Sequence, residues 1–154
     1  KTLMQISDIH IGNRFDYGYI VDSFKKAQEF NPDFVVYTGD YVSYENEEQF
    51  QQLEEVLQHV VRGKIGTVGI LGNHDYGKNW AEQNVADNIS TQLTSSGVEL
   101  LKNDQVDIEG LNIIGFDDYW SLNFAPEKVM TYYDETKANL LLCHNPDVCD
   151  LDIW

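Results

Sequence analysis

Residues 68–75 have the sequence VGILGNHD, in which an apolar run passes directly into polar residues. The apolar part, Val68 to Leu71, has the length and composition of a buried strand. The polar part offers the amide oxygen of Asn73 and the imidazole of His74, and metal sites in proteins use both kinds of atom. This junction predicts a functional site at the carboxyl end of a strand.

The same kind of junction occurs three more times along the chain. Apolar strands are predicted at residues 3–6, 34–37 and 139–143, and polar residues follow each of them. Successive strand ends meet at one edge of an open α/β sheet, where ligands bind, so we expect the junctions to share one crevice. The four junctions are Ser7 to His10, Gly39 to Asp40, Gly72 to Asp75 and His144 to Asn145.

Helical periodicity occupies the segments between these strands. Apolar residues recur at helical spacing within residues 20–30 and within residues 50–60. Asn79 followed by Glu82 resembles the start of a third helix, which would end before a glycine at position 97. The chain therefore begins with an alternation of strands and helices.

A change of pattern follows the third helix. Apolar and polar residues alternate on both sides of Glu109 and Gly110, which predicts a β-hairpin. Because βα units come first and hairpin strands come later, we expect an α/β fold with mixed sheets. The absence of repeats and linkers favours one domain over residues 1–154.

The chain is strongly acidic, with 26 aspartate and glutamate residues, 10 lysine and arginine residues and a formal charge of −16. This charge disfavours polyanionic partners, so we expect no nucleic-acid partner and no nuclease activity. Carboxylates suit divalent cations, because a bound ion offsets their mutual repulsion. The sequence also has no run of roughly 18 apolar residues, so no membrane span is predicted.

Five of the polar residues could hold two ions side by side. Asp8 and His10 are two positions apart, and on an extended segment their side chains would point the same way. The two carboxylate oxygens of Asp40 could bridge two ions. Asn73 and His144 would suit a second ion beside the first.

The ordered set of motifs resembles one known family. The motifs are DIH at 8–10, GD at 39–40, GNHD at 72–75 and a histidine at 144. Their order is similar to that of the calcineurin-like metallophosphoesterase family, and LLLCHNPD at 140–147 resembles a bacterial YkuE-like branch of phosphohydrolases. The resemblance implies an α/β/β/α sandwich of two mixed sheets flanked by helices.

The resemblance further implies a hydrolase that holds two divalent ions, which would be manganese, zinc or iron. Asp8 and His10 would bind the first ion. Asn73 and His144 would bind the second ion, and Asp40 would bridge the two. A hydroxide shared by the ions would then attack the phosphorus atom.

Catalytic and substrate-binding roles fall on neighbouring residues. His74 is similar to the family's catalytic histidine, which donates a hydrogen bond or proton toward the leaving-group oxygen, and Asn73 and His74 would contact the substrate. Asp75, also predicted to be catalytic, either orients His74 or accepts backbone hydrogen bonds. Arg14 either clamps a substrate phosphate or is an ordinary surface residue. Residues 117–120 either frame a substrate pocket or pack against the second sheet.

The final motif of the family, GHxH, is absent from this sequence. The chain has four histidines, at positions 10, 59, 74 and 144, and His59 is predicted to lie in the second helix. We expect the chain to end before this motif, which would leave each ion about one ligand short and weaken its binding. Because residue 1 is not Met, an upstream anchor could also have been removed, so both a cytoplasmic and a membrane-associated location stay open.

The sequence predicts hydrolysis of a phosphate monoester, a phosphodiester or a pyrophosphate in a small or lipid-linked substrate. Ser43 and Tyr44 stand where protein Ser/Thr phosphatases carry an acid and an arginine, so a phosphoprotein substrate is not expected. The alternative is a scaffold of the same fold that has lost catalysis and binds partner proteins. No pattern in the sequence indicates an oligomeric state.

Overall fold

The computed structural model describes residues 1–12 and 16–154. Its strands are β1 (Leu3–Ile6), β2 (Phe34–Thr38), β3 (Gly66–Ile70), β4 (Glu99–Leu100), β5 (Asp104–Ile108), β6 (Leu111–Gly115) and β7 (Ala138–Leu142). Its α-helices are α1 (Tyr17–Glu29), α2 (Glu48–Leu57), α3 (Gln83–Ser95) and α4 (Pro126–Met130). Three short 3₁₀ helices complete the set: η1 (His74–Tyr76), η2 (Lys78–Trp80) and η3 (Pro146–Asp150).

The strands form two sheets. The first has the order β1-β2-β3-β4, and all of its neighbouring strands are parallel. The second has the order β5-β6-β7, with β5 antiparallel to β6 and β6 parallel to β7. The prediction of mixed sheets therefore holds for the second sheet only. The first is parallel because a helical crossover joins each of its strands to the next.

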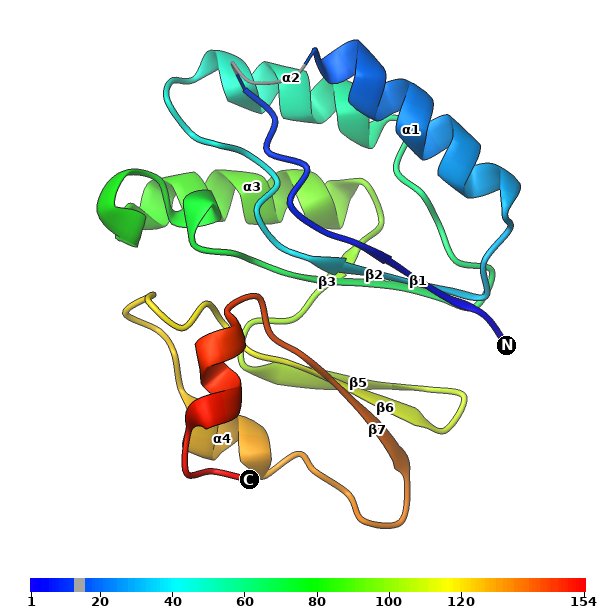
Figure 1. The fold of residues 1–154 in the computed structure, drawn as a ribbon, viewed down its shortest axis with the longest axis vertical. Helices are drawn as coiled ribbons and strands as arrows, with labels where there is room; N and C mark the ends of the chain where they lie inside the picture. The colour runs from blue at the N-terminus through cyan, green and yellow to red at the C-terminus, as the bar shows by residue number, and fades with distance from the viewer. Residues whose placement is uncertain (13–15) are drawn as a thin grey trace.

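The two sheets pack face to face between outer layers of helix. Helices α1, α2 and α3 cover one face of the first sheet, and the second sheet lies on the opposite face (Figure 1). Helix α4 lies beyond the second sheet, and η3, drawn in red, lies at the end of that sheet (Figure 1), where Val148 of η3 packs with Ile114 of β6. This order of layers confirms the predicted α/β/β/α sandwich.

Apolar side chains fill each of the three interfaces between layers. Val35 of β2 packs in the cluster under the helices, together with Leu53 of α2. Val36, on the opposite face of β2, packs in the cluster between the sheets, together with Ile113 of β6. A third cluster, which includes Phe116, lies under α4 and η3. Burial of β2 on both faces explains its continuous apolar sequence.

The predicted hairpin is confirmed, and its turn lies at the predicted position. Strands β5 and β6 pair from Asp104 with Gly115 to Ile108 with Leu111. The two residues between them, Glu109 and Gly110, have φ angles of 53° and 84°. Positive φ at both central positions is the geometry that best matches the twist of a two-residue hairpin.

The predicted start of the third helix is wrong by four residues. Helix α3 begins at Gln83, and Asn79 instead lies in η2 with a φ of 55°. The backbone N–H of Glu82 donates to the carbonyl of Tyr76 at 2.7 Å, and its carboxylate accepts from the N–H of Lys78 at 2.9 Å. These bonds close residues 76–82 into a compact loop, so the helix starts only beyond it.

Helix α2 is shorter than the sequence indicates. It ends at Leu57, and the exposed His59 lies in the following turn and not within the helix. Val60 and Val61, after the turn, are nevertheless buried, which accounts for the longer apolar period in the sequence. Within the described residues, 1–12 and 16–154, no helix combines the length and apolar character that crossing a membrane requires.

Candidate metal centre

The predicted ligands come together at the carboxyl edge of both sheets. Asp8 and His10 follow β1, Asp40 follows β2, and Asn73 follows β3. Because these strands are parallel neighbours, their loops leave the sheet side by side. His144 follows β7 of the second sheet and reaches the same place. The prediction of a shared crevice thus agrees with the arrangement of the strands.

The backbone after β1 is not extended, contrary to the prediction for Asp8 and His10. Their φ angles are 55° and 44°, in the left-handed region. The amide of Asp8 donates to the carbonyl of Gly39 at 3.1 Å, and the amide of His10 donates to that of Asp40 at 3.0 Å. The turn still brings the two side chains together, with 3.6 Å between Asp8 Oδ1 and His10 Nε2.

Two glycines allow the loops after β2 and β3 to touch. A Cβ atom on Gly39 would lie 2.4 Å from the backbone nitrogen of Gly72, and Gly39 also has a φ of 92°. A Cβ atom on Gly72 would lie 2.4 Å from Oδ1 of Asp40. The backbone therefore turns sharply at Gly39, whereas Gly72 is required by the close approach of the Asp40 side chain.

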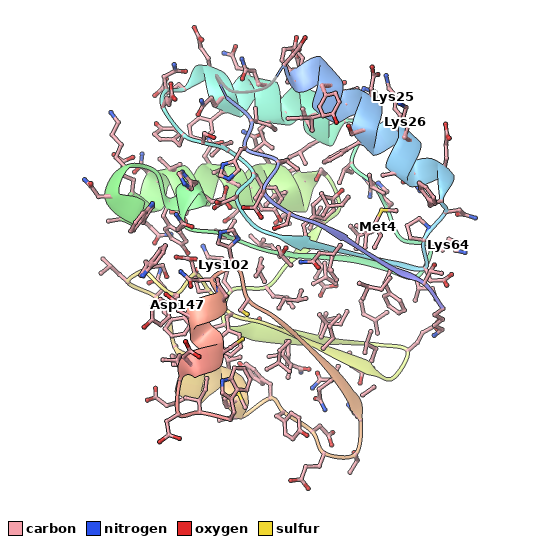
Figure 2. All side chains as sticks on the ribbon, viewed as in Figure 1. Met4, Lys25, Lys26, Lys64, Lys102 and Asp147 are labelled. Atoms are coloured by element: carbon pink, nitrogen blue, oxygen red, sulfur yellow. The ribbon has the colours of Figure 1, made fainter. Side chains whose placement is uncertain are left out.

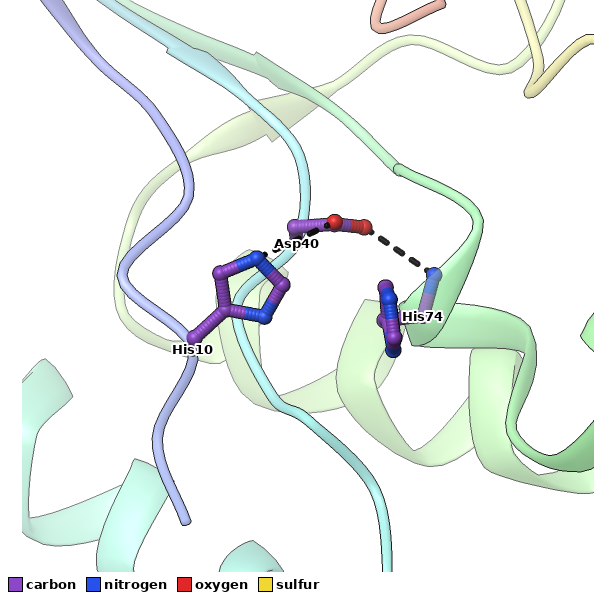
Figure 3. A group of neighbouring side chains, drawn as sticks. All are labelled: His10, Asp40 and His74. Carbon is purple, nitrogen blue, oxygen red and sulfur yellow. Dashed lines mark hydrogen bonds and ion pairs between the residues drawn. The ribbon is translucent and has the colours of Figure 1, made fainter. Parts of the chain in front are cut away.

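Asp40 is the centre of the cluster. Its side chain is almost completely buried, and its Oδ2 lies 3.4 Å from His10 Nε2 and 3.3 Å from His144 Nε2. Its Oδ1 accepts a hydrogen bond of 3.0 Å from the backbone amide of His74. Figure 3 shows Asp40 between the rings of His10 and His74. One carboxylate therefore contacts residues from three different loops.

Two groups of potential ligand atoms share Asp40. In one, atoms of Asp8, Asp40 and His144 all lie within 4.8 Å of one another. In the other, atoms of His10, Asp40 and His74 meet the same limit, and the His10 and His74 rings are 5.0 Å apart in an edge-on arrangement. The donor set of carboxylates and imidazoles fits divalent transition metals.

The electrostatics of Asp40 and His144 are linked. Burial raises the pKa of the Asp40 carboxyl, but the hydrogen bonds and charges of His144 and His74 together outweigh this effect, and the pKa is lowered overall. Burial lowers the pKa of His144, whereas Asp40 and the carbonyl of Thr38 together raise it to about 9. The Nδ1–H of His144 donates to that carbonyl at 2.7 Å, which leaves Nε2 directed toward Asp40.

Asp75 lies beneath the cluster and holds its backbone. It is completely buried, and its oxygens accept hydrogen bonds from the backbone amides of Asp40, Tyr41, Val42 and Gly72. Burial and the nearby Asp40 carboxylate raise its pKa to about 7, against the opposing effect of these amides. This geometry favours the backbone-binding alternative for Asp75. Its predicted catalytic role stays a prediction.

Two predicted site residues, Asn73 and Arg14, and one residue that was not predicted, Thr38, complete the description of the centre. Asn73 is buried and directly precedes η1, which begins with His74. Arg14 lies outside the described residues. The carbonyl of Thr38 was not predicted to take part, because a backbone contact to His144 has no signature in the sequence.

The loop at residues 117–120 packs against the first sheet's loops, not simply against the second sheet. The hydroxyl of Tyr76, in η1, donates to the carboxylate of Asp117. Trp120 stacks on Trp80 of η2, with ring centroids 4.5 Å apart. Asp117 and Asp118 are both buried, so the loop is less exposed than its composition indicates.

Comparison with known proteins gives a consistent result. The family model for calcineurin-like phosphoesterases matches residues 1–150. The chain is 25% identical over 188 residues to UDP-2,3-diacylglucosamine pyrophosphatase LpxG of Chlamydia trachomatis, covering 94% of this chain and 57% of that protein. It is 25% identical over 149 residues to the phosphodiesterase YaeI of Escherichia coli, covering 94% of this chain and 53% of that protein.

A further relative agrees with the branch that the sequence resembles. The uncharacterized metallophosphoesterase YkuE of Bacillus subtilis is 24% identical over 150 residues, covering 94% of this chain and 51% of that protein. The chain spans about half the length of these curated relatives. The match of the family model over nearly the whole chain, on a fold that gathers the family's motifs at one edge, shows that this chain belongs to the calcineurin-like phosphoesterase family.

Proposed function

We propose that this chain hydrolyses a phosphate ester or anhydride at a centre that holds two divalent metal ions. The observation that carries the proposal is the position of Asp40, which belongs to both groups of potential ligand atoms. A buried carboxylate that has both acidic and imidazole neighbours is suited to bridging two cations. Structural ion pairing alone would not require two such groups around one residue.

The ligands in this proposal are Asp8, His10, Asp40, Asn73 and His144. Atoms of Asp8 and His144 form one group with Asp40, and atoms of His10 and His74 form the other. Bound ions would supply an activated water and would offset the charge on the phosphoryl oxygens. The ions' identity is proposed only as manganese, zinc or iron, since the donors suit all three.

His74 would act on the leaving group. Its backbone amide is bound to Asp40 Oδ1, so the residue is held at the centre while its imidazole remains available. An imidazole side chain can act as a general acid toward the oxygen that leaves phosphorus. Asn73 and His74 would both contact the substrate, because they begin the loop at the edge of the centre.

The proposed substrate is a small or lipid-linked phosphate. One relative is named for a diacylglucosamine pyrophosphate substrate, and another is named a phosphodiesterase. The formal charge of −16 disfavours nucleic acid. Figure 2 shows Lys25 and Lys26 on α1 and Lys64 near the start of β1, so these lysines lie away from the strand ends that carry the ligands.

The test combines metal content with hydrolysis of bis-p-nitrophenyl phosphate by the full-length gene product. We expect bound metal and turnover that the chelator EDTA abolishes. The His74→Ala variant should keep its metal and lose most turnover, by the roughly 100- to 10,000-fold typical of losing general acid catalysis. The matched control is His59→Ala, because His59 is exposed and lies in the turn after α2. Protein that binds no metal and hydrolyses nothing would contradict the proposal and favour a scaffold.

A further inference from the structure

The loop after β6 carries two buried carboxylates, Asp117 and Asp118, at the edge where the ligands lie. Strands β6 and β7 are parallel neighbours, with Gly115 paired to Leu142. Asp118 follows the end of β6 and His144 follows the end of β7, so both leave the same edge of the second sheet. The bond from the Tyr76 hydroxyl to Asp117 ties this loop to the segment that begins with His74.

The two oxygens of Asp118 are in different situations. Oδ1 accepts a hydrogen bond of 2.9 Å from the backbone amide of Trp120, which forms a local turn. Oδ2 is buried and has no hydrogen-bond partner among the described residues. The residue as a whole is only 1% exposed. One carboxylate oxygen is therefore held inside the protein without a donor.

The surroundings of Asp118 make this arrangement costly without a cation. Burial raises the pKa of its carboxyl most, and the charges of Asp40 and Asp117 raise it further, whereas His144 lowers it. Together with the pairing of β6 and β7, this puts Asp118 at the same edge of the second sheet as His144. Buried carboxylates are normally paired or bound to metal, because desolvation of an unpaired charge is unfavourable.

We propose that Asp118 is a further acidic residue of the metal centre, and that its Oδ2 faces the cation on the side of His144. This inference rests on the proposed function, because it requires a cation beside Asp40. It adds one acidic residue beside the ligands predicted from the sequence, and it assigns the loop after β6 to the site. Asp117 is not part of this proposal, because its carboxylate accepts the hydrogen bond from the Tyr76 hydroxyl.

The competing explanation is that Asp118 only shapes its loop through Oδ1. The Asp118→Asn variant separates the two, because asparagine keeps a carbonyl oxygen for the Trp120 amide and forms such turns equally well. It replaces Oδ2 by an amide nitrogen, so the negative charge and the acceptor at that position are lost and a donor is gained. The control is Asp152→Asn, which makes the same change of charge at an exposed position near the end of the chain.

The experiment is calorimetric titration of the metal-free full-length gene product with Mn²⁺, together with its thermal unfolding. We expect Asp118→Asn to bind Mn²⁺ about 10- to 100-fold more weakly than wild type, the range seen when residues supporting metal ligands are lost. Its metal-free Tm should stay close to that of wild type, because the loss of a buried unpaired charge offsets the burial of an amide donor. Asp152→Asn should match wild type in both.

Two other results would overturn this inference. Unchanged Mn²⁺ affinity in Asp118→Asn, beside normal binding by wild type, would limit Asp118 to the loop and leave the proposed function intact. A wild-type protein that binds no Mn²⁺ would remove the proposed function and this inference together.

Discussion

The two sheets contribute to the centre in different ways. Loops of the first sheet are interlocked by their backbones: Gly39 and Gly72 allow close approach, and Asp75 accepts amide bonds from both loops. The second sheet reaches the centre with side chains, chiefly His144, which bonds to the carbonyl of Thr38 and contacts Asp40. Backbone contacts among the loops of the first sheet thus determine the geometry of the site, and the second sheet adds the side chain of His144 to it.

This difference predicts which substitutions abolish the site and which only weaken it. Asp40→Asn should lower metal affinity at both positions, by more than the roughly 100-fold upper range for an outer residue. His144→Asn should affect one position, because His144 belongs to one ligand group only. Calorimetric titration with Mn²⁺ measures both. Equal losses in the two variants would contradict the special position of Asp40.

Substitution of Asp75 tests the backbone contacts among the loops of the first sheet. Asp75→Asn replaces one accepting oxygen by a donor, so about two of the four backbone amides would lose their partner. Each unsatisfied buried group costs about 1–3 kcal/mol, so we expect a loss of about 2–6 kcal/mol in the free energy of unfolding. Urea denaturation of the metal-free protein measures it. A variant as stable as wild type would show that Asp75 does not hold the loops.

The glycines offer a direct comparison between the sheets. Gly39→Ala, in the first sheet's loop, should cost about 2–4 kcal/mol, because it combines a positive φ with a Cβ that meets Gly72. Gly110→Ala, in the hairpin of the second sheet, has a positive φ but no atom within 4 Å of the new Cβ. Its cost should be about 1–2 kcal/mol. Similar losses in urea denaturation would contradict the difference.

The smallest expected effect lies at the opposite end of the first sheet. The hydrogen bond from Lys64, with that from the Thr2 amide, lowers the pKa of Asp33 to about 2 from an ordinary 3.8. A carboxyl group whose pKa is lowered by folding stabilises the folded state at pH values above its unfolded-state pKa. This stabilisation is lost as the pH falls through the folded-state pKa of about 2. Asp33→Asn should therefore lower Tm slightly at pH 6 and less at pH 2. The opposite trend would contradict the pairing.

Much of this architecture could be predicted from the sequence, because strand ends followed by polar residues have a simple meaning in a parallel sheet. The junctions at Asp8, Asp40, Asn73 and His144 all lie at the predicted edge. The hairpin at Glu109 was predictable because apolar and polar residues alternate on both sides of Gly110, a residue that readily adopts the positive φ of such a turn. These features depend on local sequence and on one rule of topology.

Other features could not be predicted, because they depend on contacts between distant segments. Asp75 accepts bonds from amides more than 30 residues away, and no local pattern indicates such partners. The left-handed backbone at His10 arises from pairing with the loop after β2. Asp118 looks like part of an exposed loop in the sequence, and only the fold buries it.

The most direct test of the account is the electron paramagnetic resonance spectrum of the full-length gene product loaded with Mn²⁺. If Asp40 bridges two ions, the spectrum should show a spin-coupled pair of Mn²⁺ ions, and Asp40→Asn should abolish that coupling. A spectrum of isolated Mn²⁺ ions at full loading, or coupling that persists in Asp40→Asn, would contradict a centre built around one shared carboxylate.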